Sequence, residues 1–155
     1  MPRPGEQKLF SVKNKVIIIT GGAGFLGMEY AAFLSRAGGR VVIFDVLPQD
    51  VLRSCANKIF KAAGKKPLAM SVDITNPQEV KRAVTTVVRD LKQVDVLINN
   101  AAINPSPGSP ESSQQFLPYE SYPVELWRKE LEVSITGSFI VTRAVIPVMK
   151  KQRKG

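Results

Sequence analysis

The stretch Thr20-Gly-Gly-Ala-Gly-Phe-Leu-Gly27 decides the fold. It follows Lys15-Val-Ile-Ile-Ile, a run of β-branched residues typical of a strand that is covered on both faces. It leads into Phe25 to Ala37, where apolar residues recur at helical spacing. Glycines at such a turn let the backbone approach a pyrophosphate, and the helix N-terminus offers free N–H donors. The stretch therefore predicts a strand–turn–helix unit that binds a dinucleotide.

The rest of the chain alternates strands and helices in the same way. This alternation predicts a parallel sheet with right-handed crossovers, which is the doubly wound α/β class. We expect a Rossmann-type sheet that is incomplete, with about four strands in the order 3-2-1-4. Pro147 is expected to kink or interrupt the last helix. Beyond the first unit, the predicted strands are 40–45, 67–71 and 94–99, and the predicted helices are 49–63, 76–91 and 124–150.

Two segments depart from this pattern. Residues 1–12 read as a polar N-terminal tail, and residues 13–155 as one nucleotide-binding domain. Within the domain, residues 103–123 contain five prolines and Gly108. A connection of this length in a compact α/β domain is usually a functional loop or lid.

The composition excludes several kinds of chemistry. The chain has 155 residues, 44% of them hydrophobic and 23% charged, which is ordinary for one globular domain. It has no histidine, so Ser-His-Asp and Cys-His nucleophile systems and most zinc sites are excluded. No carboxylate cluster suggests a metal site. The lone Cys55 cannot form an internal disulfide, which fits a reducing compartment.

The net charge of +9 does not by itself indicate a nucleic-acid partner. Lysine and arginine are scattered along the chain, and the only dense run, 150–154, has no aromatic residues for base stacking. We interpret that run as a solvated helix end, because cations suit helix C-termini. The first apolar run is too short for a signal core or a membrane span, so we expect a cytoplasmic protein that does not bind membranes.

Asp45 ends the second predicted strand, 18 positions beyond Gly27. A carboxylate at this place accepts hydrogen bonds from the ribose hydroxyls of a dinucleotide and repels a 2′-phosphate. Asp45 therefore favours NAD over NADP as the cofactor. The alternative is that Asp45 only caps the following turn.

The chain resembles the short-chain dehydrogenases/reductases. The resemblance rests on the glycine stretch, on Asp73-Ile74-Thr75 after the third strand, and on Asn99-Asn-Ala-Ala102 after the fourth. It implies that Asp73 and Ile74 bind the adenine, that Asn99 stabilises the central sheet, and that Asn100 to Ala102 line the nicotinamide-side ribose. The implied cofactor-binding residues are Gly21, Ala23, Gly24, Phe25, Leu26, Gly27, Asp45, Val46, Asp73, Ile74, Asn100, Ala101, Ala102 and Val133.

The motifs combine two branches of that family. The glycine spacing is similar to that of the extended branch, which includes nucleotide-sugar epimerases and dehydratases. The Asp73 and Asn99 motifs are similar to the classical branch, and two motifs outweigh one. The long 103–123 loop resembles members linked to sugar metabolism.

The chain also departs from the family at the residues that perform its chemistry. Ser134 stands where the family has a helix asparagine that completes the catalytic tetrad. The family's Tyr-x-x-x-Lys pair is missing, because Tyr30, Tyr119 and Tyr122 are followed four residues later by Leu, Pro and Leu. We therefore expect the cofactor-binding part of an oxidoreductase for alcohols or ketones, including sugar-derived ones, and assign no catalytic residue.

Other interpretations stay open. The chain could be a non-catalytic nucleotide-binding or interaction module, in which case the strand 94–98 would be an apolar sheet edge that needs a partner. It could instead be a relative of the extended-type nucleotide-sugar epimerases. We expect a homo-oligomer, and we rank nucleic-acid binding lowest.

Overall fold

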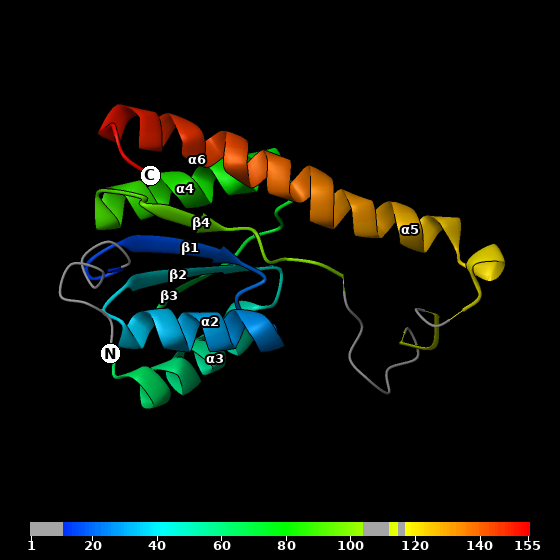
Figure 1. The fold of residues 1–155 in the computed structure, drawn as a ribbon, viewed down its shortest axis with the longest axis horizontal. Coiled ribbons are helices and arrows are strands. Elements are labelled where there is room, and N and C mark those ends of the chain that lie inside the picture. The colour runs from blue at the N-terminus through cyan, green and yellow to red at the C-terminus, as the bar shows by residue number, and fades with distance from the viewer. Residues whose placement is uncertain (1–10, 104–111, 115–116) are drawn as a thin grey trace, which may run out of the picture.

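The computed structural model, which describes residues 11–103, 112–114 and 117–155, has a four-stranded parallel sheet at its centre (Figure 1). The strand order is β3-β2-β1-β4, and every neighbouring pair is parallel. The predicted α/β fold and the order 3-2-1-4 are therefore confirmed. The strands are β1 (Val16–Thr20), β2 (Arg40–Asp45), β3 (Leu68–Ser71) and β4 (Val96–Ile98).

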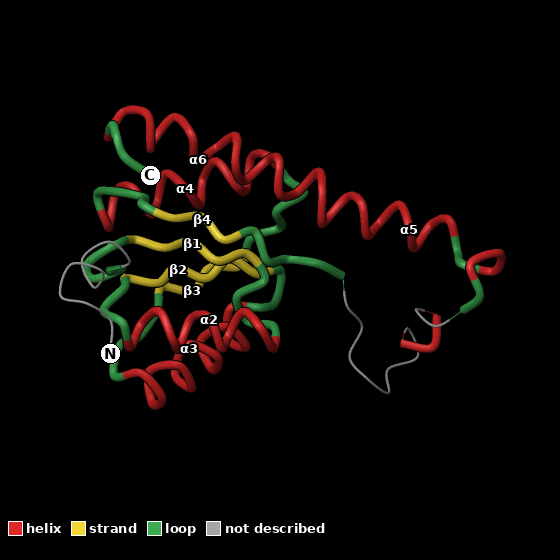
Figure 2. The backbone as a smooth tube through the Cα atoms, in the orientation of Figure 1, coloured by secondary structure: helices red, strands yellow, loops and turns green. Residues whose placement is uncertain are grey.

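Helices cover both faces of the sheet (Figure 2). One face carries α2 (Phe25–Arg36) and α3 (Gln49–Ala63), and the other carries α4 (Pro77–Leu91) and α6 (Ser138–Gln152). This two-sided cover explains why β1 is apolar at successive positions, with all five of its residues buried. At the sheet edges the cover is thinner, and β4 is only partly buried.

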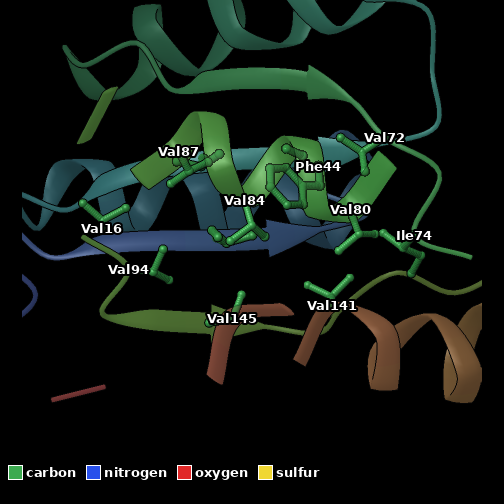
Figure 3. Packing of buried hydrophobic residues seen from close by; sticks show 13 residues of the cluster. Val16, Phe44, Val72, Ile74, Val80, Val84, Val87, Val94, Val141 and Val145 are labelled. Atoms are coloured by element: carbon green, nitrogen blue, oxygen red, sulfur yellow. The ribbon is translucent and has the colours of Figure 1, made fainter. Parts of the chain in front are cut away.

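Successive residues of β1 point to opposite faces and enter two separate cores. Ile17 and Ile19 pack with Ala31 of α2 and Ile59 of α3. Val16 and Ile18 belong to the second core, which Figure 3 shows from close by. There, side chains of α4 and α6 meet the sheet, and the labelled residues are Val16, Phe44, Val72, Ile74, Val80, Val84, Val87, Val94, Val141 and Val145.

A nearly continuous helical rod runs from α5 (Val124–Leu131) through a π turn, η3 (Glu132–Gly137), into α6. The part of the rod that overlies the sheet is α6, and α5 extends beyond it (Figure 1). Pro147 lies inside α6 without ending it, so the predicted interruption is wrong. Val141 and Val145 are buried in the core between α6 and the sheet, and this packing stabilises the helix on the N-terminal side of Pro147.

By length and composition alone, the rod 124–152 could also span a membrane, since its most apolar window has a mean hydropathy of 1.4. Long core helices of globular proteins meet the same criterion. Only 17% of that window is buried, so the rod leaves much apolar surface uncovered. Part of the predicted loop 103–123, namely residues 104–111 and 115–116, lies outside the described residues. Its described part includes a short 3-10 turn, η2 (Tyr119–Ser121).

Asp95 anchors the amino-terminal end of the sheet. Its Oδ2 accepts hydrogen bonds from the Val16 backbone N–H (2.8 Å) and from Gln93 Nε2 (2.6 Å). Lys154 and Lys15 approach its Oδ1 at 3.4 and 3.8 Å. Burial by itself raises the pKa of Asp95, but the Val16 N–H and the two lysines outweigh it and hold the pKa below its usual value.

We expect Asp95 to make folding stability depend on acid pH. Because its pKa is lower in the folded state than in the unfolded state, its stabilisation is present above about pH 4 and is lost as pH falls through the folded-state pKa. Asp95→Asn should therefore lower the free energy of unfolding at pH 7 by about 1–3 kcal/mol and should flatten its decline below pH 4. Urea denaturation at pH 7 and pH 3 measures both effects. Asp90→Asn, at an exposed position, is the control, and equal effects of the two changes would contradict the role of Asp95.

Candidate cofactor site

A cleft of about 1190 Å³ opens at the carboxyl ends of the strands. The glycine turn after β1 forms one wall, and the residues after β2, β3 and β4 form the floor and the other walls. The turn η3 and the end of α5 close one side. In a parallel α/β sheet this edge is where ligands bind, since the loops after the strands converge there.

The glycine turn brings backbone close to backbone. Gly21 has φ +61° and lies so near β4 that a Cβ on it would be 2.8 Å from the Cα of Ala101. A Cβ on Gly27 would collide with the Gly21 carbonyl and lie 2.7 Å from the Cα of Gly22. Side chains at these two positions would push the glycine turn away from Ala101 and from α2. The first-turn N–H groups of α2, which begins at Phe25, stay free for an anionic ligand.

Thr20 connects this turn to the end of β4. Its fully buried hydroxyl accepts hydrogen bonds from the backbone N–H groups of Asn100 (3.0 Å) and Ala101 (3.1 Å). The Asn100 amide donates in return to the Thr20 and Gly21 carbonyls, both at 3.1 Å. Asn100 thus lines the cleft and also fixes its two strand ends to each other.

Asn99 has a different partner. Its side-chain amide donates to the Thr142 hydroxyl on α6 at 3.0 Å, so it ties β4 to a helix instead of lining the cleft. Together Asn99 and Asn100 connect the end of β4 to α6 and to the end of β1.

Asp45 lies at the end of β2, facing the glycine turn. Its Oδ2 accepts a hydrogen bond from the Ala23 backbone N–H at 3.0 Å, and its Oδ1 accepts a longer one from the Leu47 N–H at 3.4 Å. Each carboxylate oxygen has a second lone pair, so the group can still accept from a ligand hydroxyl. Asp45 is also more than the cap of its own turn, since it holds the glycine turn itself.

Asp73 and Ile74 follow β3. Asp73 Oδ1 accepts from the Thr75 N–H (2.9 Å) and hydroxyl (2.7 Å), and the Asp73 N–H donates to Glu79 (3.0 Å). These bonds fix the carboxylate while its other oxygen keeps no partner among the described residues. Ile74 is mostly buried but still contributes to the cleft wall.

The turn η3 shapes the remaining side. Val133 lines the cleft, and Gly137 lets Ile74 come close, since a Cβ on Gly137 would be 2.7 Å from an Ile74 methyl group. Ser134 is half buried and does not line the cleft. No catalytic role is assigned to Ser134, and its correspondence to the family's helix asparagine stays a prediction.

The structure thus brings all fourteen predicted cofactor-binding residues to one cleft. Their binding role remains a prediction. Sequence reasoning missed seven residues that line the cleft, and of these only Thr75 belongs to a quoted motif. For Lys129 and Glu132 the only available signal was their place on the same predicted helix as Val133, one turn before it and directly before it. The missed lining residues are Phe44, Leu47, Val72, Thr75, Ile103, Lys129 and Glu132.

At the start of α5, Tyr122 donates a short hydrogen bond to Glu130 Oε1 at 2.6 Å. This bond raises the pKa of Tyr122 above its usual value, because ionising the phenol would place it against a carboxylate. The phenol is therefore held in its neutral form and is a poor candidate for a general base.

Comparison with known proteins identifies the family. The model of the short chain dehydrogenase family matches residues 15–155. The uncharacterized oxidoreductase YxjF of Bacillus subtilis is 29% identical over 144 residues, which are 93% of this chain and 51% of YxjF. The short chain dehydrogenase/reductase dpmpG of Macrophomina phaseolina is 31% identical over 93% of this chain and 77% of its own length. The chain belongs to the short-chain dehydrogenase family.

A solved structure supports the same assignment. An NAD+-bound xylitol dehydrogenase superposes with a TM-score of 0.79 at 27% identity, over 93% of this chain and 51% of that one. The chain thus spans about half the length of this dehydrogenase and of YxjF. What is matched is the portion that carries the glycine turn and the four strands.

We expect Gly27→Ala to abolish dinucleotide binding, because the new methyl group would push the glycine turn away from α2. Binding of NADH, followed by nicotinamide fluorescence, measures the loss. Gly64→Ala is the control, since this glycine has φ +71° but open space around it. The control should cost about 1 kcal/mol of stability and leave binding unchanged. Normal NADH binding by Gly27→Ala would contradict the proposal that the glycine turn binds the dinucleotide.

Proposed function

We propose that this chain is the cofactor-binding part of an NAD-dependent oxidoreductase that acts on an alcohol or ketone, including sugar-derived ones. The observation that carries the proposal is the pairing of Asp45 with the glycine turn at the mouth of one cleft. A carboxylate and a set of free backbone N–H groups, side by side, suit a ribose diol and a pyrophosphate.

The cleft supports a definite orientation for the dinucleotide. The pyrophosphate would lie on the first turn of α2, and the adenine would lie between Ile74 and Val133 with Asp73 at its edge. The second ribose would reach the backbone after β4, at Asn100 to Ala102. Bound in this way, the nicotinamide would supply hydride transfer, and the residues of this chain would bind and orient it.

No residue of the chain is proposed to transfer the proton. The sequence has no tyrosine with a lysine four positions later, and the Tyr122 phenol is held by Glu130. We therefore expect the chain to bind cofactor without catalysing turnover. This observation also favours the second candidate, a non-catalytic nucleotide-binding module. The two differ in whether fusion to a family segment bearing Ser and Tyr-x-x-x-Lys produces activity.

Asp45 supports the preference for NAD. The two residues that follow it, Val46 and Leu47, are apolar and line the cleft, so the segment directly after Asp45 supplies no cation to pair with a 2′-phosphate. A 2′-phosphate there would face a carboxylate instead. The proposed preference therefore rests on repulsion between the Asp45 carboxylate and the 2′-phosphate of NADP as much as on hydrogen bonds from the ribose hydroxyls of NAD to that carboxylate.

We expect NADH to bind at least tenfold more tightly than NADPH, a difference of about 1.4 kcal/mol. Asp45→Asn should shrink this ratio, because the amide keeps the size of the side chain but removes its charge. Fluorescence titration with both cofactors measures the ratio, and the exposed Asp50→Asn on α3 is the matched control. Equal binding of NADH and NADPH by the unaltered chain would refute the role given to Asp45.

A homo-oligomer is also proposed for this chain. Exposed apolar residues recur every four positions along α5, η3 and α6, at Trp127, Leu131, Ile135 and Phe139. In addition, β4 pairs only with β1 among the described strands, which leaves one edge of the sheet open. An apolar helical stripe and an open sheet edge each favour association with another copy.

The double change Ile135→Glu/Phe139→Glu should convert the oligomer to monomer, since it places charges in the stripe. Sedimentation velocity gives the mass of each form. A control places one such charge on an exposed apolar residue of α3, Ala62→Glu, and should leave the mass unchanged. A monomeric unaltered chain, or an unchanged mass in the double variant, would contradict an interface on the stripe.

A further inference from the structure

The amino-terminal ends of the strands form a strongly basic face, at the opposite end of the sheet from the cleft. Every strand is preceded or begun by exposed cations. We call this surface the basic pole and define it by Lys13, Arg36, Arg40, Lys65, Lys66 and Lys92, all of them exposed. These residues are far apart in the sequence, and the parallel topology collects them, because all four strands begin at the same edge.

Hydrogen bonds show that the four loops of the pole are neighbours. The Gly38 carbonyl accepts from the Asn14 N–H (3.0 Å) and from Lys65 Nζ (3.4 Å), which joins the loops before β1, β2 and β3. Arg40 donates to the Leu91 carbonyl (3.4 Å) and so joins β2 to the loop before β4. The pole is therefore one continuous surface held by bonds between its loops.

The charge of the pole is not neutralised within the described residues. The segments 11–15, 36–40, 64–67 and 91–95 contain one carboxylate, Asp95, which is buried and already faces Lys15 and Lys154. Nearby Asp90 pairs with Arg89. Helices α2, α3, α4 and α6 end at this pole, and each helix C-terminus carries about half a negative charge. Six cations against about 2 negative charges from the four helix dipoles leave a positive excess.

Within the described residues, the loop segments of the pole also lack the side chains that other anionic partners require. None of its four loop segments carries an exposed large apolar or aromatic side chain. Such side chains stack on the bases of single strands or insert into a membrane. A surface with cations but without apolar or aromatic side chains suits a partner that carries closely spaced phosphates and is bound through them alone. A nucleic-acid duplex is such a partner, since it carries one negative charge per about 1.7 Å of its axis.

We propose that the basic pole binds the phosphodiester backbone of a nucleic-acid duplex without reading its sequence. The sequence predicts the opposite, since its cations are scattered along the chain, but the fold places six of the 22 lysines and arginines together on one face. The proposal does not depend on the proposed cofactor. The pole and the cleft lie at opposite ends of the strands, so a duplex and NADH should bind at the same time.

The test uses the full chain with fluorescein-labelled 20-base-pair duplexes of arbitrary sequence, one of DNA and one of RNA, followed by anisotropy between 50 and 200 mM NaCl. With about six phosphate contacts, the slope of log K against log[NaCl] should be about −5 for DNA. A comparable affinity for the RNA duplex indicates recognition of the shared backbone, and a preference for one duplex identifies the polymer.

The decisive variant is Lys13→Gln/Lys65→Gln/Lys66→Gln/Lys92→Gln. It should weaken duplex binding at least tenfold at 50 mM NaCl and bring the slope to about −2, since four contacts are lost. The matched control, Lys58→Gln/Lys81→Gln/Arg82→Gln/Arg143→Gln, removes the same charge from exposed positions elsewhere and should keep the slope of the unaltered chain. Circular dichroism confirms that both variants are folded.

Three outcomes would overturn the proposal. The first is the absence of duplex binding at 50 mM NaCl. The second is an equal loss in the two quadruple variants, which would show that only the overall net charge attracts the duplex. The third is binding to vesicles of 70% phosphatidylcholine and 30% phosphatidylserine without binding to either duplex, which would assign the pole to a membrane surface.

Discussion

The close approach of the ends of β1 and β4 is the constraint on which the rest of the structure depends. Gly21 lies against the backbone of Ala101 with no room for a side chain between them. The Thr20 hydroxyl and the Asn100 amide bond these two segments to each other. Because the two strand ends are fixed, the glycine turn and the loop after β4 open as opposite walls of one cleft. Asn99 extends the same junction to α6, so the junction also positions a helix.

Local patterns were sufficient to predict most of this architecture. The continuous β-branched runs of β1 and β2 could only be strands covered on both faces, and Asn76-Pro77 marked the start of α4, where Asn76 caps the helix through the Gln78 and Glu79 N–H groups. The fourteen cleft residues were named from the resemblance to the short-chain dehydrogenases/reductases, and most of them follow strands whose carboxyl ends meet at one edge of the sheet. Lys129 and Glu132 were missed because their approach depends on the π turn η3, which has no signature in the sequence. Pro147 was misjudged because tertiary burial outweighed a local rule.

A parallel sheet also gives the molecule two chemically different ends. At the carboxyl ends, the N-terminus of α2 and the carboxylates of Asp45 and Asp73 surround the cleft. At the amino-terminal ends, the C-termini of helices and the loop cations meet around the buried Asp95. Net charge alone could not reveal this division, because charges of both signs are interspersed along the chain. The strand direction is what separates them in space.

The bond between Asp45 and the Ala23 N–H has a consequence for attempts to redesign the cofactor preference. The carboxylate that would meet the ribose also holds the glycine turn in place before any ligand arrives. A substitution at position 45 changes both the charge seen by the adenosine half and the stiffness of the phosphate loop. Selectivity and preorganisation are thus coupled in one side chain. An engineer who wants to admit NADP without loosening the loop would keep Asp45 and introduce a cation at the neighbouring Val46, which is 70% exposed.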